Sequence, residues 1–314
     1  MPADKEAIAA RRPAQRTQGL LALAATVTIW SSTFVLIKAV VEDTGPLTLT
    51  SLRFVVALAV LLPLARRRGF RWRMLAQPTF LLFGLTGTAL YYGLQNLGLL
   101  YTSAGAAAMI QAGIPAVTAL LSFFLLKERL APVRVLGITL AVAGVLLISA
   151  AQPPGASGRA LLGNGLIVGS VFAFAIWTVQ GKLLVASVPP VVVTTASIAA
   201  GLLYLLPATA VELALTGLPR ISPLGWFAVL YLGIMSSALT LFLWNFALSV
   251  VDASLAAVYI NLVPVIGLVF AALYGETVAA VQVVGGGLAM AGVWLSERAG
   301  ASPATRRASP AAGE

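Results

Sequence analysis

The chain has 314 residues, of which 60% are hydrophobic and only 10% are charged. A soluble domain carries roughly 25% charged residues, so a soluble globular protein and a disordered one are both excluded. No histidine or cysteine is present, which excludes disulfides, catalysis by a thiolate or an imidazole, and the usual zinc or haem sites, and the net charge of +10 favours contact with anionic lipid headgroups over nucleic acid.

Ten apolar runs are long enough to cross a bilayer, which takes about 20 residues of helix. They are continuous blocks rich in Leu, Ala and Val, without the period-2 alternation of barrel strands, so we predict an all-α membrane protein with ten transmembrane helices. The first run is longer than the apolar core of a signal peptide, and we expect it to persist as an uncleaved span. In chain order the runs are roughly 18–41, 47–65, 75–98, 104–126, 131–150, 162–184, 190–213, 223–247, 253–274 and 279–297.

The basic residues predict that both termini lie in the cytoplasm. Ten spans put the termini on one side of the membrane, and with that side inside, sixteen of the twenty Lys and Arg residues fall in the tails or the inner loops. We therefore expect a multi-pass protein of the bacterial inner membrane, with cytoplasmic tails at 1–17 and 298–314. The four exceptions, which we place outside or near the outer ends of spans, are Lys38, Arg53, Arg159 and Arg220.

The second half of the chain repeats the first at a separation of about 144–149 residues. The matches are collinear and include residue types that rarely coincide by chance: Trp30 with Trp177, Asn96 with Asn245, Pro115 with Pro264, and Glu128 with Glu276. We predict one five-helix repeat over 18–151 and a second over 162–297. Because each repeat holds an odd number of spans, the second enters the membrane inverted, as in secondary transporters, whose substrate site lies between the halves around a central cavity.

Each repeat opens with a Trp, small polar residues and a Lys, and closes with a Glu before a helix with spaced glycines. The residues are Trp30-Ser31-Ser32-Thr33-Phe34 with Lys38, Trp177-Thr178 with Lys182, Glu128 with Gly137 and Gly144, and Glu276 with Gly285 and Gly292. This pattern, over about 18–297, resembles the EamA-type branch of the drug/metabolite transporter superfamily, and within it looks closest to the YddG-type exporters of aromatic amino acids. The resemblance implies a ten-helix basket that moves substrate from cytoplasm to periplasm.

Polar and aromatic side chains in mid-span are the candidates for substrate binding, because polar groups are costly in lipid and usually face the bundle interior. Aromatic faces stack on a substrate ring, and amides and hydroxyls bond the ammonium and carboxylate of a zwitterion. The alternative for each residue is packing and hydrogen bonding between helices. The candidates are Trp30, Tyr91, Tyr92, Gln95, Asn96, Gln111, Trp177, Gln180, Trp244, Asn245, Tyr259 and Asn261.

The mid-span prolines Pro115 and Pro264 are expected to kink their helices, either as static bends or as hinges. For Lys38 and Arg53 we expect snorkelling to the headgroups or pairing with nearby acids, and the alternative is attraction of a substrate carboxylate. The small residues at 137–144 and 285–292 are expected to pack within one chain, with a dimer contact as the weaker alternative.

These features predict a secondary transporter that exports amino acids, aromatic and other neutral ones foremost, or similar small metabolites, by alternating access. No Asp or Glu lies near the middle of a span, which favours an uncoupled or exchange mechanism, while coupling through Glu128, Glu212 or Glu276 stays open. The alternative is a same-fold exporter of another cargo, such as drugs or a cofactor precursor. A nucleotide-sugar cargo would require a basic cavity, and the lack of cations in mid-span counts against that cargo.

Other classes of protein fit the sequence less well. An intramembrane protease would need His or a pair of membrane-embedded Asp residues, so we expect no enzymatic activity, and the repeat within one chain argues against a passive channel. The expected partners are a small-molecule substrate and membrane lipids, with the protein a monomer or weak dimer. We expect no nucleic acid, no cofactor and no metal.

Overall fold

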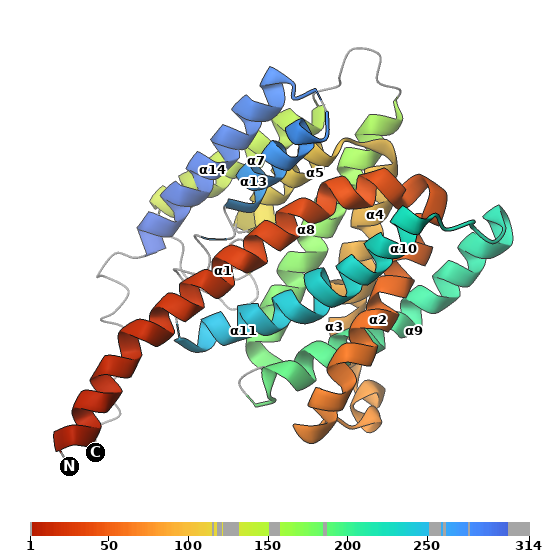
Figure 1. The fold of residues 1–314 in the computed structure, drawn as a ribbon. Helices are drawn as coiled ribbons and strands as arrows, with labels where there is room; N and C mark the ends of the chain where they lie inside the picture. The colour runs from red at the N-terminus through yellow and green to blue at the C-terminus, as the bar shows by residue number, and fades with distance from the viewer. Residues whose placement is uncertain are drawn as a thin grey trace.

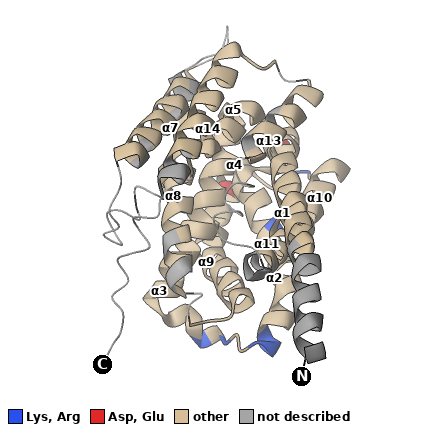
Figure 2. Ribbon diagram, turned by 90° about the vertical axis from the view of Figure 1, so that its left-hand side faces the viewer, with Lys and Arg blue, Asp and Glu red and all other residues tan. Residues whose placement is uncertain are grey.

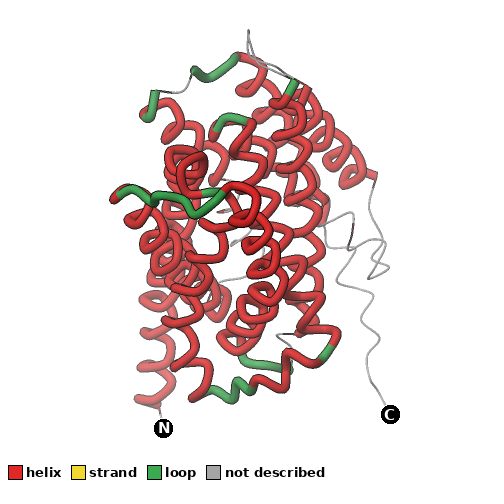
Figure 3. The backbone as a smooth tube through the Cα atoms, turned by 90° about the vertical axis from the view of Figure 1, so that its right-hand side faces the viewer, coloured by secondary structure: helices red, strands yellow, loops and turns green. Residues whose placement is uncertain are grey.

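The computed structural model describes residues 2–114, 116–117, 121, 132–150, 158–184, 187–250, 259, 262–275 and 277–300. Over these residues the chain forms helices and no strand (Figure 3). The first half comprises α1 (Pro2–Thr44), α2 (Pro46–Arg67), η1 (Trp72–Ala76), α3 (Pro78–Gly84), η2 (Leu85–Leu90), α4 (Tyr91–Tyr101), α5 (Ala104–Ile110), η3 (Gln111–Gly113) and α7 (Pro132–Ala150). The second half comprises α8 (Arg159–Leu184), α9 (Pro190–Thr216), α10 (Pro223–Leu230), η4 (Tyr231–Leu239), α11 (Thr240–Val250), α13 (Leu262–Leu273) and α14 (Ala280–Gly300).

Five helices of the described part are long and apolar enough to cross a membrane, judged by length and composition. They cover Thr17–Thr44, Pro46–Arg67, Arg159–Thr178, Pro190–Thr216 and Pro223–Trp244. Large apolar side chains such as Leu161, Leu203 and Phe242 are exposed on their outer faces, where lipid would cover them. The prediction of an all-helical membrane protein is confirmed, and the count of ten spans in two inverted repeats stays a prediction.

Several basic residues gather at one end of the molecule. Figure 2 shows basic residues at the lower end of the molecule, where α2 ends and the loop toward α3 begins, at the end from which α1 starts. Arg66 and Arg67 lie in the last turn of α2, where a cation interacts favourably with the helix dipole. The run at 66–73 thus forms one basic end of the bundle.

The start of α2 is held by a residue from the other half of the chain. Gly45 has a positive φ of 83°, and a Cβ there would lie 2.8 Å from Glu212 Oε2. The Glu212 carboxylate, from α9, accepts from Leu47 N at 3.0 Å, from Thr48 N at 2.7 Å and from the Thr48 hydroxyl at 2.7 Å. It therefore caps the helix N-terminus, where orphan N–H groups favour an anion.

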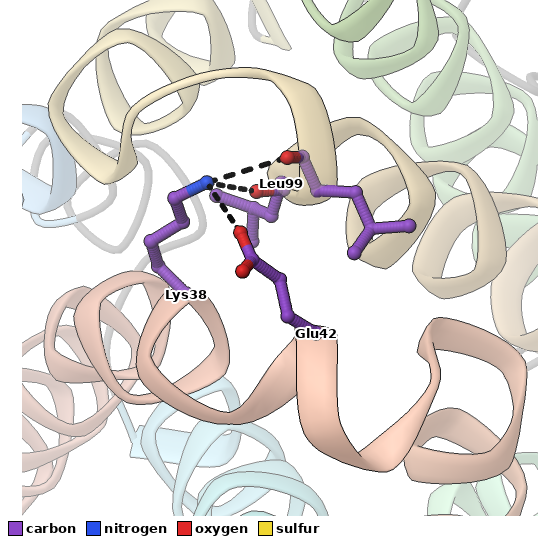
Figure 4. A network of polar contacts seen from close by, with 4 residues as sticks. Lys38, Glu42 and Leu99 are labelled. Atoms are coloured by element: carbon purple, nitrogen blue, oxygen red, sulfur yellow. Dashed lines mark hydrogen bonds and ion pairs between the residues drawn. The ribbon is translucent and has the colours of Figure 1, made fainter.

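Lys38 has a matching structural role at a helix C-terminus. Its Nζ donates to the carbonyl oxygens of Leu99 at 3.0 Å and Leu100 at 3.4 Å, near the end of α4, and lies 3.9 Å from Glu42 Oε1 (Figure 4). A cation at this end of a helix is favoured by the dipole. The predicted pairing of Lys38 with a nearby acid is observed.

The small-residue faces of α7 and α14 pack against each other, and the two helices lie side by side in Figure 1. A Cβ added at Gly144 would collide with the backbone of Gly285 and Ala289, and one at Gly292 with the backbone of Gly137 and Ala141. Glycine is needed at these positions because the two backbones touch there. These faces contact each other within one chain, as the sequence analysis expected.

The remaining helices of the two halves are interleaved. Helix α1 packs on α11 and α13 of the second half, and α8 packs on α4 and α5 of the first. Helices α2 and α9 pack on each other, and they also contact η4 and η2 respectively. Glycines permit the last two contacts, since a Cβ at Gly233 of η4 would lie 2.8 Å from the carbonyl oxygen of Arg53, and one at Gly201 of α9 would collide with the Cβ of Thr88 in η2. The centre of the bundle is therefore walled by both halves.

Two of the predicted spans differ from regular α-helices. The helix over 78–101 contains a π-helical stretch, η2, and the helix over 223–250 contains another, η4. The two stretches correspond at the 149-residue separation that relates Gly84 to Gly233. π-Helical turns are rare and occur mostly at functional sites, because the wider turn shifts the side chains and backbone carbonyls that follow it. Here both stretches border the interior of the bundle.

Candidate substrate cavity

A cavity with about 650 Å³ of space free of protein atoms lies where helices of both halves converge. The wall combines aromatic rings, apolar side chains, two amides and one cation. The lining residues are Trp30, Thr33, Phe34, Arg53, Tyr91, Tyr92, Gln95, Gln111, Ala112, Ile114, Phe174, Ser236 and Val263.

A second, smaller cavity of about 300 Å³ shares three aromatic residues, Tyr91, Tyr92 and Phe174, with the first. The ring of Tyr91 lies 4.5 Å from that of Tyr92 and 4.8 Å from that of Phe174, centroid to centroid. Edge-to-face and tilted rings at these distances attract each other and hold a fixed arrangement. The smaller cavity adds Phe54, Gly87, Thr88, Trp177, Thr194, Ser197, Ile198 and Leu241 to the lining.

Arg53 is the largest departure from the sequence analysis, which placed it near the outer end of a span. Its side chain is 1% exposed and lines the larger cavity. Its Nε donates to Ser237 Oγ at 3.3 Å, and its Nη2 donates to Ser236 Oγ at 3.2 Å and Ser237 Oγ at 3.0 Å. Snorkelling is therefore wrong for Arg53, and the structure shows no pairing of Arg53 with any described acid.

Aromatic rings complete the surroundings of this cation. The guanidinium carbon lies 4.7 Å from the ring centre of Tyr92 and 5.3 Å from that of Phe54. Such contacts favour a cation through the negative face of the ring. No carboxylate forms an ion pair with Arg53 within the part of the chain that the structure describes. The sequence-based statement that the spans lack an interior cation is therefore wrong.

Two glutamines present unpaired atoms at the same cavity. The Tyr91 hydroxyl donates to Gln111 Oε1 at 3.0 Å, and Gln111 Nε2 is buried without a hydrogen-bond partner among the described residues. Gln95 Oε1 is buried and unpaired as well. Buried polar atoms are nearly always satisfied in folded proteins, so an unsatisfied donor and acceptor on one cavity wall indicate a place for a polar ligand.

The repeat-related tryptophans lie in different cavities. Trp30 lines the larger one. Its Nε1 donates to Thr240 Oγ1 at 2.9 Å and to the carbonyl oxygen of Ser236 at 3.3 Å. Trp177 lines the smaller one, with Nε1 donating to Ser197 Oγ at 3.2 Å. Its indole packs so closely on Gly87 of η2 that no Cβ fits there. Each tryptophan thus crosses to a π-helical segment of the other half.

Four further candidates lie outside both cavity walls. Asn96 is fully buried and donates to Thr50 Oγ1 at 2.8 Å on α2. Gln180 Oε1 accepts from the Thr86 hydroxyl at 3.2 Å, and the ring of Trp244 packs 5.6 Å from that of Trp30. Tyr259 packs against the apolar core. These side chains make the interhelical contacts that were the stated alternative.

The other predicted positions are described only in part or not at all. Asn245 lies in α11 and Pro264 in α13, with their side chains outside the described residues. Pro115, Asn261, Glu128 and Glu276 lie outside the described residues altogether. Of the twelve binding candidates, the structure places five on the wall of the larger cavity and Trp177 on the smaller: Trp30, Tyr91, Tyr92, Gln95 and Gln111 share the former.

Arg53 lies on a face of α2 that the structure, and not the sequence alone, shows to be buried. The buried residues of α2 include Thr50, Arg53, Ala57 and Leu61, which recur every three or four residues and so form one helix face. An arginine on the buried stripe of an apolar helix is directed toward protein rather than lipid. The lining residues Phe174 and Ser236 could not be recognised from the sequence as cavity residues, because apolar and small residues are common throughout the spans.

A multi-pass helical protein with an interior cavity of mixed polar and aromatic lining belongs to the class that carries small solutes across membranes. The comparison with known proteins agrees. The chain belongs to the EamA-like transporter family, which it matches over residues 17–150 and 161–298. It is thus a transporter with a small-molecule substrate and a lipid environment.

Several relatives are similar over most of their length. An "Uncharacterized transporter" of Archaeoglobus fulgidus is 31% identical, covering 88% of this chain and 98% of the relative. A "Probable terminal-alkyne amino-acid exporter" of Streptantibioticus cattleyicolor is 28% identical (90% and 94%), and a "Probable amino-acid metabolite efflux pump" of Salmonella typhimurium is 29% identical (90% and 95%). One crystal structure shares the fold, with a TM-score of 0.61 and 22% identity over 93% of this chain and 100% of that one.

Proposed function

We propose that this protein exports amino acids, aromatic and other neutral ones foremost, or similar small metabolites, across the bacterial inner membrane by alternating access. The observation that carries the proposal is the central cavity. Its wall combines aromatic rings with one cation and with two glutamine amides, each of which has one atom without a hydrogen-bond partner among the described residues. A zwitterion with an aromatic or apolar side chain matches that wall. The relatives named as an amino-acid exporter and an amino-acid metabolite efflux pump support the same cargo.

We infer that the chain is built as two inverted five-helix repeats, over 18–151 and 162–297, with ten spans. The interleaved contacts support this, because α1 with α11 and α13 has its counterpart in α8 with α4 and α5. The corresponding π-helical stretches support it too. In such carriers one half rocks against the other around a site between them. The basic end at 66–73 would then face the cytoplasm, together with both tails.

The cavity walls favour an uncoupled or exchange mechanism. No Asp or Glu is among the described residues that line either cavity. Glu212, one of the three acids left open for ion coupling, is engaged by two backbone N–H groups and a hydroxyl at the start of α2. A carboxylate held in that way has a structural role, and proton coupling through it would require those bonds to break.

Counterflow in proteoliposomes tests the proposal. Vesicles holding the purified protein are loaded with unlabelled phenylalanine, tryptophan or threonine, and uptake of the labelled amino acid is followed without an ion gradient. We expect saturable uptake, and reduced uptake for Trp177→Ala, which enlarges the smaller cavity. Unsaturable flux would indicate a channel, and no uptake by folded, monodisperse protein would overturn amino-acid export by an uncoupled carrier.

A further inference from the structure

Among the described residues, Arg53 is a charge without a counter-charge in the interior of the bundle. Its hydrogen-bond partners are two serine hydroxyls and its other neighbours are two aromatic rings, all of them neutral. Of the acids whose side chains are described, Glu212 is bound at the start of α2, Glu42 is paired with Lys38, and Asp43 is exposed. Hydroxyl groups and aromatic rings lower the free-energy cost of burying a cation, but only an anion neutralises its charge.

Part of the Arg53 guanidinium has no hydrogen-bond partner among the described residues. Nε and Nη2 are occupied by Ser236 and Ser237, whereas Nη1 makes no hydrogen bond with any described residue. A guanidinium has five N–H donors in a rigid plane that matches the two oxygens of a carboxylate. The serines hold the guanidinium through Nε and Nη2, which leaves the two N–H donors of Nη1 for a ligand in the cavity that Arg53 lines.

The unpaired amide atoms lie on the same wall as this cation. Gln95 Oε1 is an acceptor without a donor and Gln111 Nε2 is a donor without an acceptor. The bond from the Tyr91 hydroxyl to Gln111 Oε1 sets the orientation of that amide and leaves its NH₂ group available. A ligand with a carboxylate and an ammonium would engage Arg53 and Gln111 through the first group and Gln95 through the second.

We propose that Arg53 binds the carboxylate of the transported molecule, so that the cargo must carry an anionic group. The inference rests on the proposed transport function and narrows its substrate class. Carboxylates are accepted with or without an α-ammonium, and the corresponding amides and amines are rejected. The rival explanation is that Arg53 only ties α2 to η4 through the two serines, in which case acid and amide would be recognised alike.

The test compares three probes that share one phenyl side chain. L-phenylalanine carries both charged groups, 3-phenylpropionate keeps only the carboxylate, and L-phenylalaninamide keeps only the ammonium. Each competes for labelled phenylalanine in counterflow, and each is tested for thermal stabilisation of the purified protein in detergent. We expect the two acids to act at concentrations at least about tenfold lower than the amide, the range for a charge-assisted bond.

Variants of Arg53 then test whether this residue causes the preference for the acids over the amide. In Arg53→Gln, the effective concentrations of the acids and the amide should lie within about threefold of each other. Arg53→Lys should keep part of the preference for the acids because it keeps the charge. The control Arg220→Gln changes an exposed arginine and should match the wild type. If Arg53→Gln does not fold, the double variant Ser236→Ala with Ser237→Ala keeps the guanidinium but frees its plane, and it should weaken both acids while the amide is unchanged.

The outcomes separate this inference from the proposed function. Wild-type protein that accepts the amide as well as the acids, or Arg53→Gln protein that keeps the acid preference, would overturn the role of Arg53 and leave transport intact. No uptake of any probe would overturn amino-acid export, but stabilisation by 3-phenylpropionate that is lost in Arg53→Gln would still support the carboxylate site. Absence of that stabilisation in wild-type protein would overturn the site.

Discussion

The carboxylate of Glu212 offers a test that separates a structural cap from a coupling site. It accepts two backbone N–H groups and one hydroxyl at 2.7–3.0 Å, and it joins α9 to the first turn of α2. Removal of a side-chain cap costs about 1–2 kcal/mol. Because Glu212 satisfies two orphan donors and carries a charge at the positive end of a helix, we expect Glu212→Ala to cost about 2 kcal/mol.

The magnitude is measurable by thermal unfolding in detergent. About 2 kcal/mol corresponds to a fall in Tm of roughly 3–4 °C in a chain of this size. Glu212→Gln keeps the shape and one acceptor oxygen, so it should lose about half as much. The control is Glu42→Ala, whose side chain is 71% exposed and whose ion pair is long, at 3.9 Å, so its Tm should stay close to that of the wild type.

Transport by the same variants completes the test. Glu212→Gln should keep counterflow activity and should respond to an imposed proton gradient no differently from the wild type, because a cap takes no part in proton transfer. A variant with unchanged Tm that has lost uptake, or one that changes the response to the gradient, would refute the assignment of Glu212 as a structural cap.

Three further predictions concern close packing and the cavity. Gly87→Ala puts a methyl group into the indole ring packed on η2, so we expect counterflow to fall at least about fivefold, whereas Gly165→Ala, in open space on α8, should leave it unchanged. Gly144→Leu separates two backbones in contact and should lower the free energy of unfolding by about 3 kcal/mol, with Gly287→Leu as the uncrowded control in thermal unfolding. Tyr91→Phe removes the donor to the Gln111 amide and should raise the KM for uptake by about threefold to tenfold, while the unsatisfied acceptor costs about 1–3 kcal/mol of stability. An unaltered KM would contradict a role for this bond in the site.

The sequence determined the class of this protein because hydrophobicity is a local property. Long apolar runs predict helices in a membrane whatever their partners are, and the polar residues within them are few enough to be candidates for an interior site. Five of the candidates that line the larger cavity, among them Tyr91, Gln95 and Gln111, were found in that way. The small residues of α7 and α14 also indicated close helix contact from their spacing alone.

The tertiary structure decided which way each polar residue faces and how deep it lies. Gln95 and Asn96 are adjacent amides in one helix, but a single residue step turns the side chain by about 100°, so the first lines the cavity and the second bonds to α2. Arg53 follows Pro46 by seven residues, about 10 Å along the helix axis, and was assigned to the membrane surface from that distance. Its burial depends on two serines of η4 more than 180 residues away, and no local pattern reports where a distant helix will pack.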